Sequence, residues 1–116
     1  MKIEIISQPI SLEQLKNAAR NSYGDMVKIV ADVERRIIAL GGEMHADAEA
    51  VLLNDGSRQQ NLWGFNVYPE KSRAEWIEFT SLINIRPRAN NRSMEIQDPV
   101  VQKNILDIID KLIAQS

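Results

Sequence analysis

Three arginines, Arg86, Arg88 and Arg92, lie within seven consecutive residues in the second half of the chain. Arginine guanidinium groups bind carboxylate and phosphate oxygens through paired hydrogen bonds, and the nearby Asn84 and Asn91 would add uncharged donors. These residue types predict an anion-binding loop that takes a small anion, a nucleotide phosphate or an acidic partner. The glycine-rich loop that often cradles a phosphate does not accompany them.

An internal use of the same arginines is the alternative. Glu78, Glu95 and Asp98 are acids of this chain that the loop could reach, and ion pairs with them would neutralise the arginines without any ligand. The residues by themselves leave both interpretations open.

A second candidate site is the run that contains His45, Asp47 and Glu49. At alternate positions of a strand, these side chains would face one side and offer one imidazole and two carboxylates, a set that suits a divalent metal or acid–base catalysis. The alternative is structural: Asp47 caps a helix, Glu49 complements the helix dipole, and His45 hydrogen-bonds a backbone group.

The composition of the chain excludes several kinds of site and partner. The chain has 116 residues, no cysteine, one histidine and a net charge of -2, so thiolate and multi-histidine metal centres are excluded within one chain. A nucleic-acid partner is not expected without a basic excess, and no apolar run is long enough to span a membrane. We expect one domain over residues 1–116, a cytoplasmic location and no cofactor.

The elements that must position these residues are visible as local patterns. Residues 3–6 read as a first strand, and Ser11 with Gln14 forms a capping box for a helix that ends near Gly24. Asp47 is the expected N-cap of a short helix through residue 53. Asp98 and Pro99 begin the last helix, at its cap and first turn.

Residues 26–40 fit two structures. Apolar residues recur there at helical spacing, yet β-branched residues also alternate with polar ones. We slightly favour a pair of strands that turns near residues 34–35.

Residues 63–68 and 77–86 alternate most clearly and predict an antiparallel hairpin. In the expected register, Val67 faces Ile77, Asn66 faces Glu78, and Trp63 faces Ser81 on the core side. Trp76 would lie on the opposite, more exposed face. Residues 94–96 would add a short edge strand.

The fold class that these elements predict is α+β, with a mainly antiparallel sheet and helices packed on one face. The apolar stripe of the last helix extends to Val100, Leu106 and Ile113, beyond what a small sheet covers. An uncovered apolar patch of this kind predicts self-association through a strand edge or the last helix, for example as a homodimer.

Four segments together resemble a family of small prokaryotic proteins known only as a domain of unknown function. They are residues 45–49 (HADAE), 55–57 (DGS), 62–66 (LWGFN) and 78–87 (EFTSLINIRP). The resemblance extends over nearly the whole chain and implies no activity, ligand or catalytic residue.

Two classes of function stay open. The first is a non-catalytic binding or interaction protein that uses the arginine loop, and it is favoured because catalysis needs a convergent set of groups. The second is a small metal-assisted, hydrolase-like enzyme that uses His45, Asp47 and Glu49. The sequence does not decide whether the protein is an enzyme.

Overall fold

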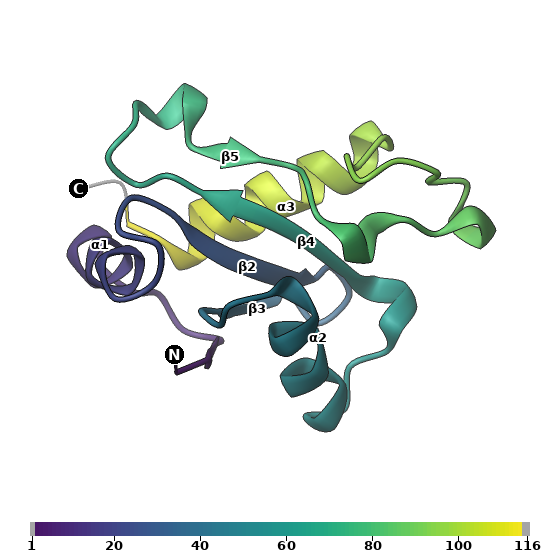
Figure 1. Cartoon of the computed structure of the whole chain (residues 1–116), viewed down its shortest axis with the longest axis horizontal. Coiled ribbons are helices and arrows are strands. Elements are labelled where there is room, and N and C mark those ends of the chain that lie inside the picture. The colour runs from purple at the N-terminus through teal and green to yellow at the C-terminus, as the bar shows by residue number, and fades with distance from the viewer. Residues whose placement is uncertain (1, 115–116) are drawn as a thin grey trace.

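An antiparallel sheet forms the centre of the molecule (Figure 1). The structure is a computed structural model and describes residues 2–114. Within these residues, five strands pair in the order β1-β3-β2-β4-β5. The strands are β1 (Glu4–Ile6), β2 (Val27–Asp32), β3 (Ile37–Leu40), β4 (Leu62–Val67) and β5 (Ile77–Glu78). The helices are α1 (Leu12–Arg20), α2 (His45–Asn54) and α3 (Pro99–Leu112). Short 3-10 turns are η1 (Gln59–Asn61), η2 (Arg73–Glu75), η3 (Leu82–Asn84) and η4 (Pro87–Ala89).

The predicted α+β class with a mainly antiparallel sheet is confirmed, and the ambiguous segment is the strand pair β2–β3. Asp32 closes its turn, since Oδ1 accepts hydrogen bonds from the backbone amides of Glu34 and Arg35 at 2.9 Å each. Arg36 completes the turn with a φ of 59°. A side-chain cap of this kind stabilises a turn locally, so β2 and β3 return alongside one another.

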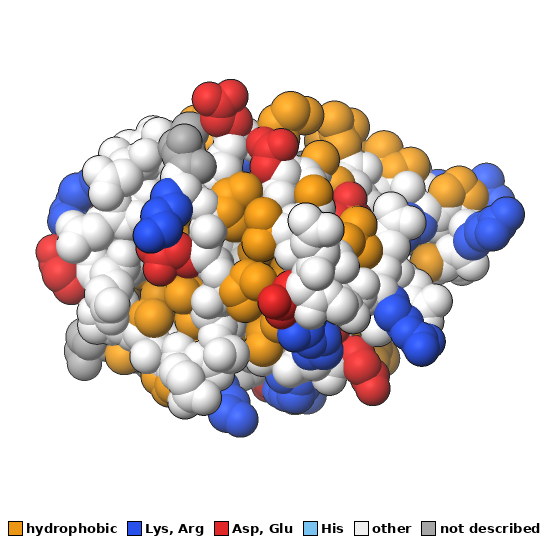
Figure 2. All heavy atoms as spheres, turned by 90° about the horizontal axis from the view of Figure 1, so that it is seen from below, with side chains coloured by type: hydrophobic (Ala, Val, Ile, Leu, Met, Phe, Trp, Pro, Cys, Tyr) orange, Lys and Arg blue, Asp and Glu red, His pale blue; other side chains and the backbone are white. Residues whose placement is uncertain are grey.

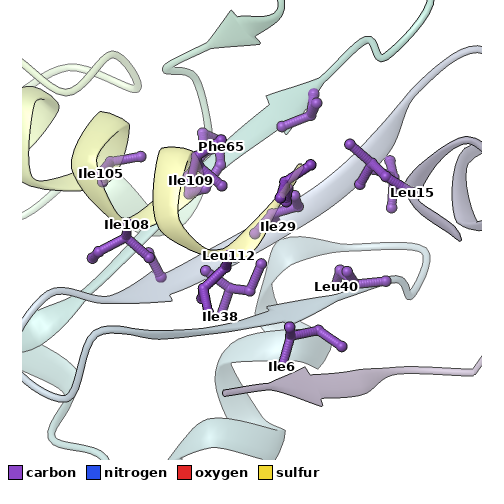
Figure 3. Close-up of a cluster of buried hydrophobic side chains, with 14 of the residues drawn as sticks. Ile6, Leu15, Ile29, Ile38, Leu40, Phe65, Ile105, Ile108, Ile109 and Leu112 are labelled. Carbon is purple, nitrogen blue, oxygen red and sulfur yellow. The ribbon is translucent and has the colours of Figure 1, made fainter. Parts of the chain in front are cut away.

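Helices cover both faces of the sheet. α1 and α3 pack on one face, where Ile105, Ile108 and Ile109 of α3 meet Ile29 and other sheet residues (Figure 3). α2 packs on the opposite face through Ala48 and Leu52. The predicted packing on one face therefore holds for α1 and α3, and α2 adds a second layer because its own apolar residues face β2, β3 and β4.

The helix caps follow the sequence closely, with one shift. Ser11 Oγ accepts from the Gln14 amide at 3.1 Å, and Asp98 Oδ1 accepts from the Val100 amide at 2.8 Å, as predicted. α2 begins at His45 with Met44 as its N-cap, three residues before the predicted start, so Asp47 is not the N-cap. Asp47 lies in the first turn, where its Oδ2 accepts from the Met44 amide at 3.2 Å.

The β4–β5 hairpin has the predicted register only at its beginning. Val67 pairs with Ile77 and Asn66 with Glu78, but the strand predicted through residue 86 ends at Glu78. Beyond it, Thr80 forms an isolated bridge with Glu95, and the chain turns into η3. Ser81 therefore does not lie opposite Trp63 as a strand residue.

Both tryptophans are buried, which confirms the core position of Trp63 and makes the predicted exposure of Trp76 wrong. Trp76 Nε1 donates to the Pro69 carbonyl at 3.2 Å, and the Arg73 guanidinium covers the ring at 4.0 Å. The loop before β5 thus folds over Trp76, a tertiary contact that strand alternation does not reveal.

At α3, Ile113 is buried and bridges to Ile10, so it does not extend an outer apolar stripe. Val100 and Leu106 are exposed. Self-association through this helix stays a prediction that rests on these two residues.

We predict that Trp63→Ala lowers the free energy of unfolding by roughly 3–5 kcal/mol, because it leaves a large cavity under β4. Leu106→Ala is the control, since Leu106 is 44% exposed and its truncation should change stability by only about 0.5 kcal/mol. Urea unfolding followed by circular dichroism measures both. Equal, small losses in the two variants would contradict the core position of Trp63.

Candidate functional site

The Asn84 side chain takes the place of a strand residue beside β4. Its Oδ1 accepts from the Gly64 amide at 2.9 Å, and its Nδ2 donates to the Gly64 carbonyl at 2.9 Å. Two such bonds are what a directly paired residue of a neighbouring antiparallel strand would make with its backbone. The fully buried amide therefore continues the sheet edge where β5 has stopped.

Asn91 holds the following loop in the same way. Its Nδ2 donates to the carbonyls of Asn84, Ser93 and Glu95 at 2.8–3.0 Å. Its Oδ1 accepts from the Gln97 amide at 2.8 Å. The amide groups of Asn84 and Asn91, which we predicted as anion donors, are thus engaged by the backbone and shape the loop.

Arg86 reaches back from this loop to α2. Its Nη2 lies 3.4 Å from Oε2 of Glu49, and its guanidinium lies over the Trp63 ring at 4.9 Å. The two paired side chains are only 14% and 12% exposed. Burial lowers the pKa of Arg86, while the Glu49 carboxylate acts in the opposite direction. The internal partner is therefore Glu49, which the sequence had placed in the other candidate site.

An open cleft of about 820 Å³ lies in front of this ion pair. Its walls come from α2, η1 and the segment that runs through η3 and η4. The lining residues are Glu49, Gln59, Gln60, Leu82, Ile83, Ile85, Arg86, Pro87, Arg88 and Ala89. Arg88 is an exposed member of this lining, whereas Arg92 is also exposed but lies outside it.

The structure separates His45, Asp47 and Glu49. His45 is buried against β4, Asp47 is exposed at the start of α2, and Glu49 faces Arg86. A helix turns about 100° per residue, so alternate positions point in different directions. Among residues 2–114, no group of three or more acidic or histidine side chains is arranged to hold a metal ion.

His45 is an uncharged, buried ring. Its Nε2 lies 2.8 Å from the Phe65 carbonyl oxygen and must donate, because a carbonyl only accepts. Burial lowers the pKa of His45 to about 4, and the nearby Lys28 ammonium acts in the same direction. The hydrogen bond to Phe65 and the adjacent Asn66 side chain favour the charged form but do not outweigh burial.

Sequence patterns did not indicate Glu49, Gln59 or Gln60 as neighbours of the arginine loop. Glu49 and Arg86 are 37 positions apart, and η1 is brought to the cleft by the turn after α2. The Glu49–Arg86 contact could not be predicted from the order of the elements along the chain, because the contact forms only when α2 covers the second face of the sheet.

Fold and site together define a small α+β domain with an arginine-containing cleft on the α2 side of its sheet. The chain belongs to the family described as "Protein of unknown function (DUF5674)", whose model matches residues 4–112. This match confirms the resemblance to a domain of unknown function. No curated protein and no solved structure matches the chain. Within residues 2–114, no helix has the length and apolar character that a membrane crossing requires.

We predict that Asn84→Leu lowers the free energy of unfolding by at least about 3 kcal/mol, because the buried N–H and C=O of Gly64 would lose their hydrogen-bond partners. Asn54→Leu is the control at an exposed position of α2 and should be near neutral. Denaturant unfolding compares the two. A near-neutral Asn84 variant would contradict the strand-replacing role of the amide.

The buried His45 also predicts a pH dependence. Between pH 6.5 and about 4, the unfolded chain binds a proton at His45 that the folded chain does not. Acidification through this window should therefore destabilise the fold by up to about 3 kcal/mol, with no further loss from His45 below it.

His45→Gln isolates this contribution, because glutamine does not titrate and can still donate an N–H to the Phe65 carbonyl. We expect the wild-type protein to lose about 3 kcal/mol more than the variant between pH 7 and pH 4, by urea unfolding at each pH. A stability difference that does not change with pH would contradict a neutral His45.

Proposed function

We propose that the protein is a non-catalytic binding protein whose cleft receives the carboxylate or phosphate of a small molecule or acidic partner. The observation that carries this proposal is the held guanidinium of Arg86 in the wall of the cleft, with the exposed Arg88 on the same lining. Arginine forks match both kinds of anion.

Arg86 is already ordered before any ligand arrives. The Trp63 ring and the Glu49 carboxylate hold the guanidinium from two sides, at 4.9 Å and 3.4 Å. Binding to an ordered side chain avoids the entropy cost of immobilising it. Arg86 Nη1 is buried and has no hydrogen-bond partner among the described residues, so Glu49 meets only part of the hydrogen-bonding capacity of the guanidinium.

The charge balance of the cleft favours an anion. Arg86 and Arg88 contribute two positive charges to the lining and Glu49 contributes one negative charge, so one positive charge remains. The chain as a whole carries a net charge of -2, which makes this local excess a feature of the cleft. The attraction to an anion should weaken as salt rises.

An apolar body on the ligand fits the rest of the lining. Leu82 and Ile85 are exposed hydrophobic residues of the cleft, and Pro87 and Ala89 lie beside them. Figure 2 shows hydrophobic side chains gathered in a band on the side of the molecule that lies below in Figure 1, with lysine and arginine at one end. We therefore expect an anionic group attached to an apolar body rather than an inorganic ion.

The enzyme alternative has less support from the geometry, because Asp47, Glu49 and His45 face different surroundings. The cytoplasmic location and the homodimer stay predictions of the sequence.

We predict that phenyl phosphate raises the melting temperature and binds more tightly than inorganic phosphate in calorimetric titration. Arg88→Ala should weaken this binding about tenfold, because a charge-assisted hydrogen bond contributes about 1.5–3 kcal/mol. Arg88→Lys should also weaken it, since the charge remains but the planar fork is lost.

The matched control is Arg92→Ala, which removes the same charge from the same loop outside the cleft. Arg92→Ala should weaken phenyl phosphate binding much less than Arg88→Ala does, because Arg92 does not line the cleft and salt screens its charge. The proposal would be wrong if no anion gave heat, or if both variants weakened binding equally.

A further inference from the structure

A second cavity lies on the same face of the sheet as α2, beside the first turn of that helix. Its volume is about 320 Å³. It shares Leu82 and Ile83 with the arginine cleft, so these two residues stand between the two spaces. The other lining residues are Tyr23, Lys28, Glu43, Met44, His45, Ala46, Asn66, Thr80, Ser81 and Met94.

Two hydrogen-bond acceptors lie in the cavity wall. Asn66 is 94% buried, and its Nδ2 donates to Glu78 Oε1 at 2.8 Å, which leaves Oδ1 as the free end of the amide. This Oδ1 is buried and has no partner among the described residues. The great majority of buried polar atoms in proteins have a hydrogen-bond partner, so an orphan acceptor at a cavity wall calls for a donor from outside the chain, either water or a ligand.

His45 supplies the second acceptor. Since Nε2 donates to Phe65, the neutral ring carries its lone pair on Nδ1, and this nitrogen can only accept. The Asn66 side chain is within hydrogen-bonding reach of the ring, a contact that favours the charged form of His45. Two neighbouring acceptors cannot satisfy one another, so a group with hydrogens to donate is needed between them.

Ser81 provides the complementary donor. It is buried in the cavity wall, and its Oγ accepts from the Ile83 amide at 3.3 Å, so its own hydrogen is available to donate. The wall therefore combines two acceptors with one hydroxyl donor. A primary carboxamide matches this set, because its NH2 group donates twice and its oxygen accepts.

The charges and the exposed hydrophobic residues of the lining indicate the net charge and the body of the ligand. The two charged residues of the lining, Lys28 and Glu43, have opposite signs. The burial and the Lys28 charge that keep His45 neutral would equally disfavour a bound cation. Four exposed hydrophobic residues surround the opening, namely Tyr23, Met44, Leu82 and Met94. Such a rim suits an aromatic or aliphatic body.

We infer that this cavity is a binding site for a neutral organic molecule that inserts a primary carboxamide among Asn66, His45 and Ser81. The apolar body of the ligand lies against Met44, Leu82 and Met94. The inference does not depend on the anion-binding role of the neighbouring cleft, since it rests on different polar groups.

Three probes of one shape test the ligand class. Benzamide is the neutral carboxamide, benzoate carries a negative charge in the same place, and benzamidine carries a positive charge. We expect benzamide to shift the His45 ring and Asn66 side-chain amide signals in NMR titrations at pH 7. Its affinity should exceed that of benzoate and benzamidine by at least tenfold.

Two variants locate the site. Met94→Lys should weaken benzamide binding at least fivefold by placing a charge at the rim. Leu53→Lys is the matched control, because Leu53 and Met94 are both 40% exposed and Leu53 lies outside the cavity. Asn66→Leu removes the inner acceptor and should abolish binding; if it fails to fold, the Met94 and Leu53 pair decides the question.

Arg88→Ala should leave benzamide binding unchanged, which separates this site from the anion cleft. The inference would be overturned by unchanged His45 and Asn66 signals at millimolar benzamide, by equal affinity for the three probes, or by equal affinity of the Met94 and Leu53 variants. Failure of phenyl phosphate to bind would not affect it.

Discussion

The pairing of the Asn84 side chain with the backbone of Gly64 is the interaction on which the rest of the structure depends. It satisfies both hydrogen-bonding groups of a buried residue in β4 without a neighbouring strand. The chain can therefore leave the sheet after Glu78 and form η3 and η4 without leaving the buried backbone groups of Gly64 unpaired. Both cavities lie against this irregular segment.

Gly64 is required here by space. A Cβ at this position would lie 2.8 Å from Cβ and Oγ of Ser81 and 3.1 Å from Cδ2 of His45. The start of α2 and the turn before η3 thus approach β4 closely enough to exclude any side chain. This close approach brings His45, Ser81 and Asn66 to one wall, and the same segment presents Arg86 to Glu49.

The arrangement separates two kinds of polar chemistry over a short stretch of surface. On one side of Leu82 and Ile83 lie a held guanidinium and an exposed arginine, which we propose bind an anion. On the other side lie an uncharged imidazole and an orphan amide oxygen, which we propose bind a neutral donor. The family model matches residues 4–112, and every lining residue of both cavities lies within this range.

Local signals in the sequence determined the caps of α1 and α3, the core strand and the fold class. Ser11 and Asp98 begin α1 and α3 because a side-chain oxygen can bond an amide only two or three residues away, a contact that needs no other part of the chain. Alternation around Trp63 and Phe65 identified a buried strand, because one face of an antiparallel sheet meets the core.

Only the tertiary structure decided what the polar residues do. The alternation of residues through 86 predicted a regular strand, but β5 ends at Glu78. The Asn84 side-chain amide forms the hydrogen bonds with Gly64 that the backbone of a longer strand would have formed. Alternation alone does not distinguish these two kinds of partner. Arg86 pairs with Glu49 rather than with the acids near it in sequence, because α2 covers the second face of the sheet. A local pattern shows which groups a chain contains, whereas their partners depend on packing between distant segments.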